Sequence, residues 1–141
     1  MERRNAWLSY NEADEKALEK DYRTFLDNGK TERECVSELS REAEAAGYVS
    51  LDKKLASGEK IQTGDKIYAV GMKKIMALFH IGEDPMEKGM NILGAHIDSP
   101  RLDVKQNPLY EDTDLTYLDT HYYGGVKKYH WVALPLAIHG V

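Results

Sequence analysis

The spacing of the apolar residues changes at Gly47, and this change constrains the fold more than any other feature of the sequence. Before Gly47, apolar side chains recur at about the period of a helix, which predicts two helices. After it, short apolar runs are separated by turn-forming residues, which is typical of strands. Two helices followed by strands predict a layered α/β fold.

Both helices carry local signals at their ends. Ser9 and Glu12 have the spacing of a capping box, and Asn28-Gly29 predicts where the first helix ends. Thr31 and Glu34 form a second capping box, and the second helix is expected to end at Gly47. One apolar stripe is expected on each helix: Ala13, Ala17, Leu18, Tyr22, Phe25 and Leu26 on the first, and Val36, Leu39, Ala43 and Ala46 on the second.

Three strands are predicted over residues 67–70, 74–81 and 91–97, with a turn at 71–73 between the first two. Residues 52–66 are charged and contain two glycines, so we expect a loop there. The segment 91–97, Asn-Ile-Leu-Gly-Ala-His-Ile, is almost continuously apolar. Such a run is typical of a strand buried on both faces of a sheet.

Composition limits the functions to consider. The net charge is −5 and the basic residues are scattered, which argues against a nucleic-acid surface. The single cysteine, Cys35, cannot form an internal disulfide, which favours a reducing, cytoplasmic location, and its helical context predicts a structural thiol. No apolar run approaches the roughly 18 residues of a membrane span, and residues 1–16 lack a signal-peptide pattern. We therefore expect no nucleic-acid or membrane partner.

The residues that point to chemistry are His96 and Asp98, at the end of the apolar segment. Residues two apart share one face of a strand, and binding sites gather at the carboxyl ends of strands in open α/β sheets. Zinc binds a neutral imidazole nitrogen, and the other ring N–H of such a ligand is usually donated to an oxygen. The spacing alone is only moderately specific, because histidines at strand ends are more often held in place for structural reasons.

The longer string at residues 94–105, Gly-Ala-His-Ile-Asp-Ser-Pro-Arg-Leu-Asp-Val-Lys, resembles the signature of the aspartyl aminopeptidase family of zinc-dependent exopeptidases. The two acidic helices, the segment Gly-Asp-Lys-Ile-Tyr at 64–68 and the Tyr-Gly-Gly at 123–125 also follow the layout of that family. The resemblance implies that His96 binds one of two zinc ions and that Asp98, at the catalytic centre, orients His96. It also implies that the other ligands and the general base follow Val141.

The resemblance further implies the start of a three-layer zinc-exopeptidase fold. Residues 1–105 would belong to the metallopeptidase domain, and residues 106–141 would begin an inserted β-rich domain through which family members form homo-oligomers. His121 and His130 are then candidates to contact substrate in the active site of a neighbouring subunit. Trp131 is followed by Val-Ala-Leu-Pro-Leu rather than by the acidic run of eukaryotic-type relatives, so the resemblance leaves the preferred N-terminal residue open.

The expected function is release of N-terminal amino acids from peptides by a water molecule that two zinc ions activate. One alternative is a catalytically inactive scaffold or assembly partner that keeps the first part of the fold. Another is a small metal-binding module, which would need further ligands that converge on His96. The uncapped apolar end of the chain, residues 131–141, predicts the N-terminal portion of a longer protein.

Overall fold

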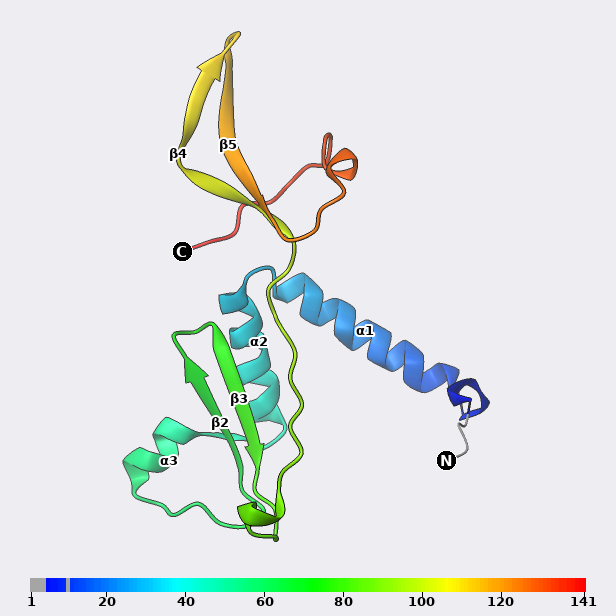
Figure 1. Ribbon diagram of the computed structural model, residues 1–141, viewed down its shortest axis with the longest axis vertical. Helices are drawn as coiled ribbons and strands as arrows, with labels where there is room; N and C mark the ends of the chain where they lie inside the picture. Colours follow the sequence, from blue (N-terminus) through cyan, green and yellow to red (C-terminus); the bar gives the residue numbers. More distant parts are fainter. Residues whose placement is uncertain (1–4, 10) are drawn as a thin grey trace. The chain divides into compact units, whose positions relative to one another are not determined.

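The computed structural model describes residues 5–9 and 11–141, which form two compact units divided between Ala95 and His96 (Figure 1). Residues 1–4 and 10, part of the segment without a signal-peptide pattern, lie outside this description. The first unit combines helices with a small sheet, which confirms the predicted α/β class. No helix in the described chain is both long enough and apolar enough to cross a membrane.

The first unit begins with a short 3-10 helix, η1 (Ala6–Ser9), and then α1 (Glu12–Asn28). The cap of α1 is Asn11, whose side chain accepts a hydrogen bond from the Ala13 amide at 3.1 Å, so the prediction of Ser9 as the cap was wrong. Ser9 belongs instead to η1, while the Asn11 side chain reaches the first free amides of α1. The predicted end at Gly29 is confirmed.

The predicted apolar stripe of α1 is not covered in the described chain, since no residue of α1 is buried. Leu18 is 70% exposed and Tyr22 is 59% exposed. The spacing of apolar residues predicts that a helix has an apolar face, but it does not predict whether another element covers that face. Figure 1 shows α1 leading away from α2 after their short connection.

The second helix, α2 (Glu32–Ala45), starts with the predicted capping box. The Thr31 hydroxyl accepts from the Glu34 amide at 3.3 Å, and the Glu34 carboxylate accepts from the Thr31 amide at 2.8 Å. Cys35, Val36 and Ala43 of α2 are buried. Burial raises the pKa of the Cys35 thiol, and its Sγ lies 3.5 Å from the Gly29 carbonyl oxygen, which fits a structural cysteine.

A three-stranded sheet packs against α2 (Figure 1). The strand β1 (Val49–Ser50) pairs in parallel with β2 (Lys66–Gly71), which pairs antiparallel with β3 (Ile75–His80). Ile67 and Tyr68 of β2 are the buried residues of this sheet, at 2% and 8% exposure. The two predicted strands and the turn between them are confirmed, with positive φ at Met72 and Lys73.

The loop expected over 52–66 was only partly right, because the helix α3 (Leu51–Ser57) occupies its start. Parallel strands cannot be joined by a tight turn, and α3 lies in the connection between β1 and β2. Gly58 ends α3 with φ 72, the left-handed conformation that glycine adopts without strain.

The predicted strand at residues 91–97 was wrong. After the 3-10 helix η2 (Met86–Lys88), residues 89–100 have no regular secondary structure, and Leu93 is fully exposed. A strand needs a hydrogen-bonded neighbour, and no described strand pairs with this segment. The segment is apolar, but the predicted burial on both faces is not found among the described residues.

The second unit is built on a hairpin of β4 (Arg101–Asp112) and β5 (Leu115–Tyr123), followed by the 3-10 helix η3 (Lys128–His130). Thr113 and Asp114 form its two-residue turn, both with positive φ. The pairing is interrupted by a register shift between Val104 and Leu109. The hairpin therefore has two regularly paired parts. The base pairs residues 101–104 with 120–123, and the tip pairs residues 109–112 with 115–118.

Candidate metal centre

His96 is the first residue of the second unit, and its ring faces two oxygens of Asp98. The Nδ1 atom lies 3.0 Å from the Asp98 backbone oxygen and 3.2 Å from Asp98 Oδ1. Both oxygens are acceptors, so the neutral ring carries its proton on Nδ1 and keeps its lone pair on Nε2. The His96 side chain is 83% exposed. The chain therefore presents Nε2 in the tautomer that binds zinc.

Asp98 is held from its other side by Tyr123. The Tyr123 hydroxyl donates a hydrogen bond to Asp98 Oδ2 at 2.9 Å, while Oδ1 faces His96. This hydrogen bond, together with the Asp98 amide and the neighbouring His96, lowers the pKa of the Asp98 carboxyl from its ordinary value. Asp98 is thus a carboxylate at neutral pH, with one oxygen facing the His96 ring and the other accepting from Tyr123.

The hairpin explains how residues far apart in sequence meet. Arg101 at the start of β4 is the register partner of Tyr123 at the end of β5, so their side chains share one face. The Arg101 guanidinium lies 4.3 Å from the centre of the Tyr123 ring, and its Nε donates to Asp103 Oδ1 at 2.8 Å. The ring that holds Asp98 is therefore itself fixed.

The Tyr-Gly-Gly segment makes a second approach to the Asp-Ser-Pro segment. Gly124 has φ 77, and a Cβ added there would lie 3.3 Å from Pro100 Cα. The Asp-Ser-Pro at 98–100 and the Tyr-Gly-Gly at 123–125 thus lie in contact within the second unit. No residue spacing in the sequence points to a role for Tyr123, and its only signal is its place in the Tyr-Gly-Gly at 123–125.

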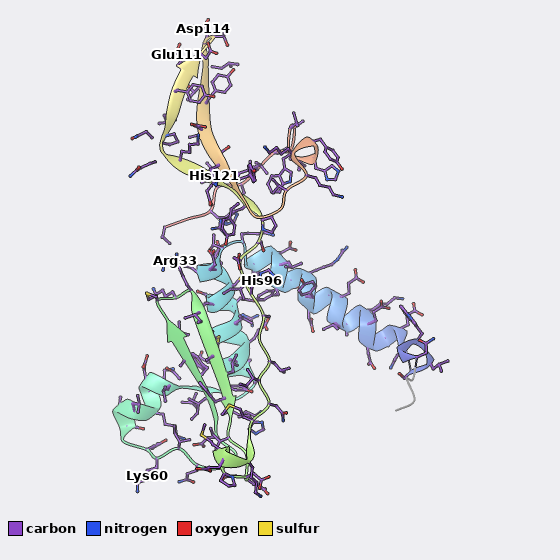
Figure 2. The ribbon with its side chains drawn as sticks, in the orientation of Figure 1. Arg33, Lys60, His96, Glu111, Asp114 and His121 are labelled. Atoms are coloured by element: carbon purple, nitrogen blue, oxygen red, sulfur yellow. The ribbon has the colours of Figure 1, made fainter. Side chains whose placement is uncertain are left out.

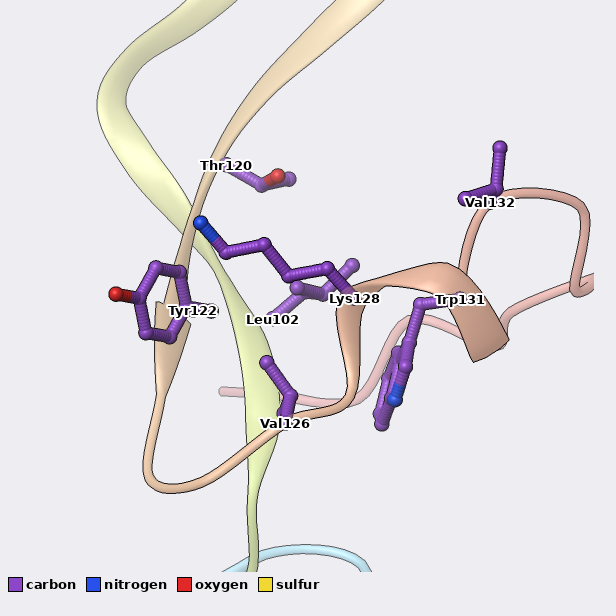
Figure 3. Close-up of a pocket in the computed structure, with 7 residues that line it drawn as sticks. All are labelled: Leu102, Thr120, Tyr122, Val126, Lys128, Trp131 and Val132. Carbon is purple, nitrogen blue, oxygen red and sulfur yellow. The ribbon is translucent and has the colours of Figure 1, made fainter.

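A pocket of about 220 Å³ lies on the opposite face of the hairpin base (Figure 3). Leu102 and Tyr122 are paired in register, so their side chains face away from the side of Arg101 and Tyr123. The pocket is lined by Leu102, Thr120, Tyr122, Val126, Lys128, Trp131 and Val132. It is separate from the His96–Asp98 pair and holds no candidate metal ligand.

The candidate substrate-binding histidines do not join His96 in the described chain. The His121 ring stacks with Tyr122 at 5.6 Å between centres, and His130 meets the Tyr129 ring edge-on at 4.3 Å. Figure 2 marks His121 on β5 and His96 before β4. A role at the active site of a neighbouring subunit stays a prediction for both.

The His96 imidazole could supply one ligand of a metal site. His96 offers an exposed imidazole with an oriented N–H. No group of three or more His, Cys, Asp or Glu side chains in the described chain is placed to hold a metal ion. A zinc ion takes four ligands, so His96 would supply one and other donors the rest.

Comparison with known proteins identifies relatives along the whole chain. The sequence profile of the family described as aminopeptidase I zinc metalloprotease (M18) matches residues 25–141. A probable M18 family aminopeptidase 1 from Clostridium acetobutylicum is 57% identical over 143 residues, covering 99% of this chain and 31% of that protein. Its namesake from Thermotoga maritima is 43% identical over 141 residues, covering 100% of this chain and 30% of that protein.

Solved structures show the same relationship. The M18 aminopeptidase of Thermotoga maritima superposes with a TM-score of 0.80 and 41% identity, covering 96% of this chain and 29% of that one. Aminopeptidase I from Clostridium acetobutylicum gives a TM-score of 0.72 and 54% identity, covering 96% of this chain and 30% of that one. The chain thus spans about a third of the length of these relatives.

The profile match covers most of the chain and includes both segments that carried the resemblance, at 94–105 and at 123–125. The family resemblance drawn from the sequence is therefore confirmed. The chain belongs to the M18 family of aminopeptidase I zinc metalloproteases.

Proposed function

We propose that this chain is part of a zinc-dependent aminopeptidase that releases N-terminal amino acids from peptides. The observation that carries the proposal is the His96–Asp98 pair, in which Asp98 contacts Nδ1 of an exposed imidazole in a chain of the M18 family. The relatives from Clostridium acetobutylicum and Thermotoga maritima are both named probable M18 family aminopeptidases. The proposal assigns their kind of activity to the complete protein that contains these residues.

His96 and Asp98 have distinct roles in this proposal. The His96 Nε2 lone pair is the donor to one of two zinc ions, and the Asp98 oxygens hold the proton on Nδ1. When bound, the zinc ions supply a Lewis acid and lower the pKa of a bound water toward about 7. Asp98 keeps the imidazole in the binding tautomer and makes it a stronger donor. The general base and the remaining ligands are proposed to lie after Val141.

We further propose that residues 1–105 belong to the metallopeptidase domain and that residues 106–141 begin an inserted β-rich domain. The compact units of the structure divide between Ala95 and His96, ten residues before this proposed boundary. The inserted domain would form homo-oligomers, in which His121 and His130 reach the active site of a neighbouring subunit. The thiol of Cys35 is buried, and a sequence with a single cysteine cannot form an internal disulfide, which is in keeping with a cytoplasmic protein.

The test of the proposed function uses the complete protein with His96→Ala and Asp98→Asn. We expect His96→Ala to lose zinc and to abolish hydrolysis of an aminoacyl substrate, because one metal site loses its ligand. We expect Asp98→Asn to lower zinc affinity or activity by about 10- to 100-fold, the usual effect of removing the partner of a metal-binding histidine. Zinc content by elemental analysis and initial rates are measured on the same samples.

His80→Ala is the matched control, because His80 is an exposed histidine on β3 in the first unit. It should keep both zinc and activity. Wild-type zinc and wild-type rate in His96→Ala would refute the ligand assignment. A wild-type protein that binds zinc but cleaves no aminoacyl substrate would favour the inactive scaffold instead.

A further inference from the structure

We propose that Tyr123 is a positioning residue of the metal centre, because its hydroxyl holds Asp98 in the orientation in which the Asp98 carboxylate fixes the His96 ring. The inference rests on the proposed function only in that it takes His96 to be a zinc ligand. It concerns a residue that acts through Asp98 and does not touch the metal or the substrate.

The first support is that the two carboxylate oxygens of Asp98 contact different partners. Oδ1 lies 3.2 Å from His96 Nδ1, and Oδ2 accepts from the Tyr123 hydroxyl at 2.9 Å. The terminal torsion of an aspartate has a broad energy minimum, and the Asp98 side chain is 38% exposed, so packing alone does not hold it. A donor at Oδ2 therefore restricts the rotation that would otherwise move Oδ1 away from His96.

The second support is that Tyr123 is better fixed than the residues it holds. His96 and Asp98 lie in a segment without regular secondary structure, whereas Tyr123 ends β5 and pairs with Arg101. The Arg101 guanidinium covers the Tyr123 ring at 4.3 Å, and Asp103 holds Arg101 at 2.8 Å. Sites supported by strands are more precise than sites held by loops alone.

The third support is the contact of the adjacent glycine. At φ 77, Gly124 brings its backbone so close to Pro100 that a Cβ would lie 3.3 Å from the proline Cα. The end of β5 thus approaches the His96–Pro100 segment at two points, through the Tyr123 side chain and through the Gly124 backbone. A register slip of one residue would turn Tyr123 to the other face and break the first of these contacts.

The competing explanation is that Tyr123 only stabilises the hairpin through its ring. Tyr123→Phe separates the two explanations, because it removes the hydroxyl and leaves the ring under Arg101. Tyr117→Phe is the matched control, since Tyr117 lies on the same strand and stacks on Tyr110 at 5.1 Å between ring centres. Both variants lose one hydroxyl from β5, but only one loses the contact with Asp98.

The experiment measures how readily the complete, zinc-loaded protein loses zinc to a chelator, alongside its melting temperature without metal. We expect Tyr123→Phe to weaken zinc retention by about tenfold, the lower end of the losses seen when a partner of a metal ligand is removed. Tyr117→Phe should retain zinc as the wild type does. The double variant Tyr123→Phe with Asp98→Asn should be no worse than Asp98→Asn alone, because a residue that acts through Asp98 has nothing left to hold.

The outcomes distinguish a failure of the proposed role of Tyr123 from a failure of the proposed aminopeptidase function. If Tyr123→Phe retains zinc as the wild type does while His96→Ala loses it, the inference is refuted and the zinc-enzyme proposal stands. If the effects of Tyr123→Phe and Asp98→Asn multiply, Tyr123 does not act through Asp98 and the inference is also refuted. If zinc retention follows the expected pattern but no peptide is cleaved, the inference stands and the aminopeptidase proposal fails.

Discussion

Lys54 and Asp65 form an ion pair that is largely shielded from water. Lys54 Nζ lies 2.6 Å from Asp65 Oδ2, and the two side chains are 13% and 24% exposed. Lys54 comes from α3 and Asp65 directly precedes β2, so the pair ties the crossover helix to the sheet. The Lys54 ammonium and then the Gln62 amide lower the pKa of the Asp65 carboxyl.

This lowered pKa predicts a pH-dependent effect of Asp65→Asn. A group with a lower pKa in the folded state stabilises the fold fully above its unfolded pKa of about 3.9, and this contribution is lost as the pH falls through the folded value. We expect Asp65→Asn to lower the melting temperature at pH 7 and to have a smaller effect at pH 3. Asp84→Asn is the control, since its pair with Lys88 is exposed and should matter little at either pH.

Gly124 is a second residue whose role follows from local geometry. Gly124→Ala places a side chain at φ 77 and against Pro100. The left-handed backbone alone costs an L-residue about 1–2 kcal/mol. We expect a lower melting temperature and weaker zinc retention in the complete protein.

Gly125→Ala is the control for Gly124→Ala, because a Cβ at Gly125 meets nothing within 4 Å and its φ is not positive. Equal effects of the two alanines on zinc retention would show that the approach of Gly124 to Pro100 does not support the metal centre.

At the scale of elements, the capping box of α2 offers a direct test. Thr31→Ala removes the hydroxyl that accepts from the Glu34 amide, and the loss of such a cap costs about 1 kcal/mol. Thr24→Ala is the control, since the Thr24 hydroxyl donates to the Lys20 carbonyl inside α1, where alanine is the better helix former. We expect denaturant unfolding followed by circular dichroism to show destabilisation for Thr31→Ala only.

The elements that could be predicted from the sequence are those with local signals. The capping box at Thr31 and the turn at 71–73 depend on residues within four positions of each other, and both are confirmed. The strand at 91–97 could not be predicted reliably, because pairing depends on a partner that apolar composition does not identify. The helix α3 was missed because its seven residues are too few and too charged to show a clear period.

The same distinction applies to the candidate site. His96 and Asp98 are two residues apart, so their proximity could be predicted, although the contact forms in an irregular segment and not at a strand end. Tyr123 is 25 positions from Asp98 in sequence, and only the register of β4 and β5 brings its hydroxyl to the carboxylate. A pattern of neighbouring residues in the sequence could not predict that contact.

At the scale of the whole molecule, we expect residues 1–141 alone to be catalytically inactive. No group of three or more potential ligands comes together in the described chain, whereas a catalytic zinc takes three protein ligands. Exposed apolar side chains, among them Leu93 at 100% and Ile138 at 80%, should make the polypeptide prone to self-association. Light scattering, zinc stoichiometry and peptide hydrolysis measure these properties. A monomer that folds cooperatively, binds two zinc ions and cleaves peptides would contradict this prediction.

The register shift in β4 has a consequence for changes in the length of the hairpin. One block of register pairs runs from Arg101↔Tyr123 to Val104↔Thr120. A second block begins at Leu109↔Leu118 and continues toward the turn. Between the two blocks, the strands contribute unequal numbers of residues. Such an irregularity absorbs length changes without passing them along the ladder. We therefore expect a residue inserted near Thr113 and Asp114 to leave Tyr123 opposite Arg101.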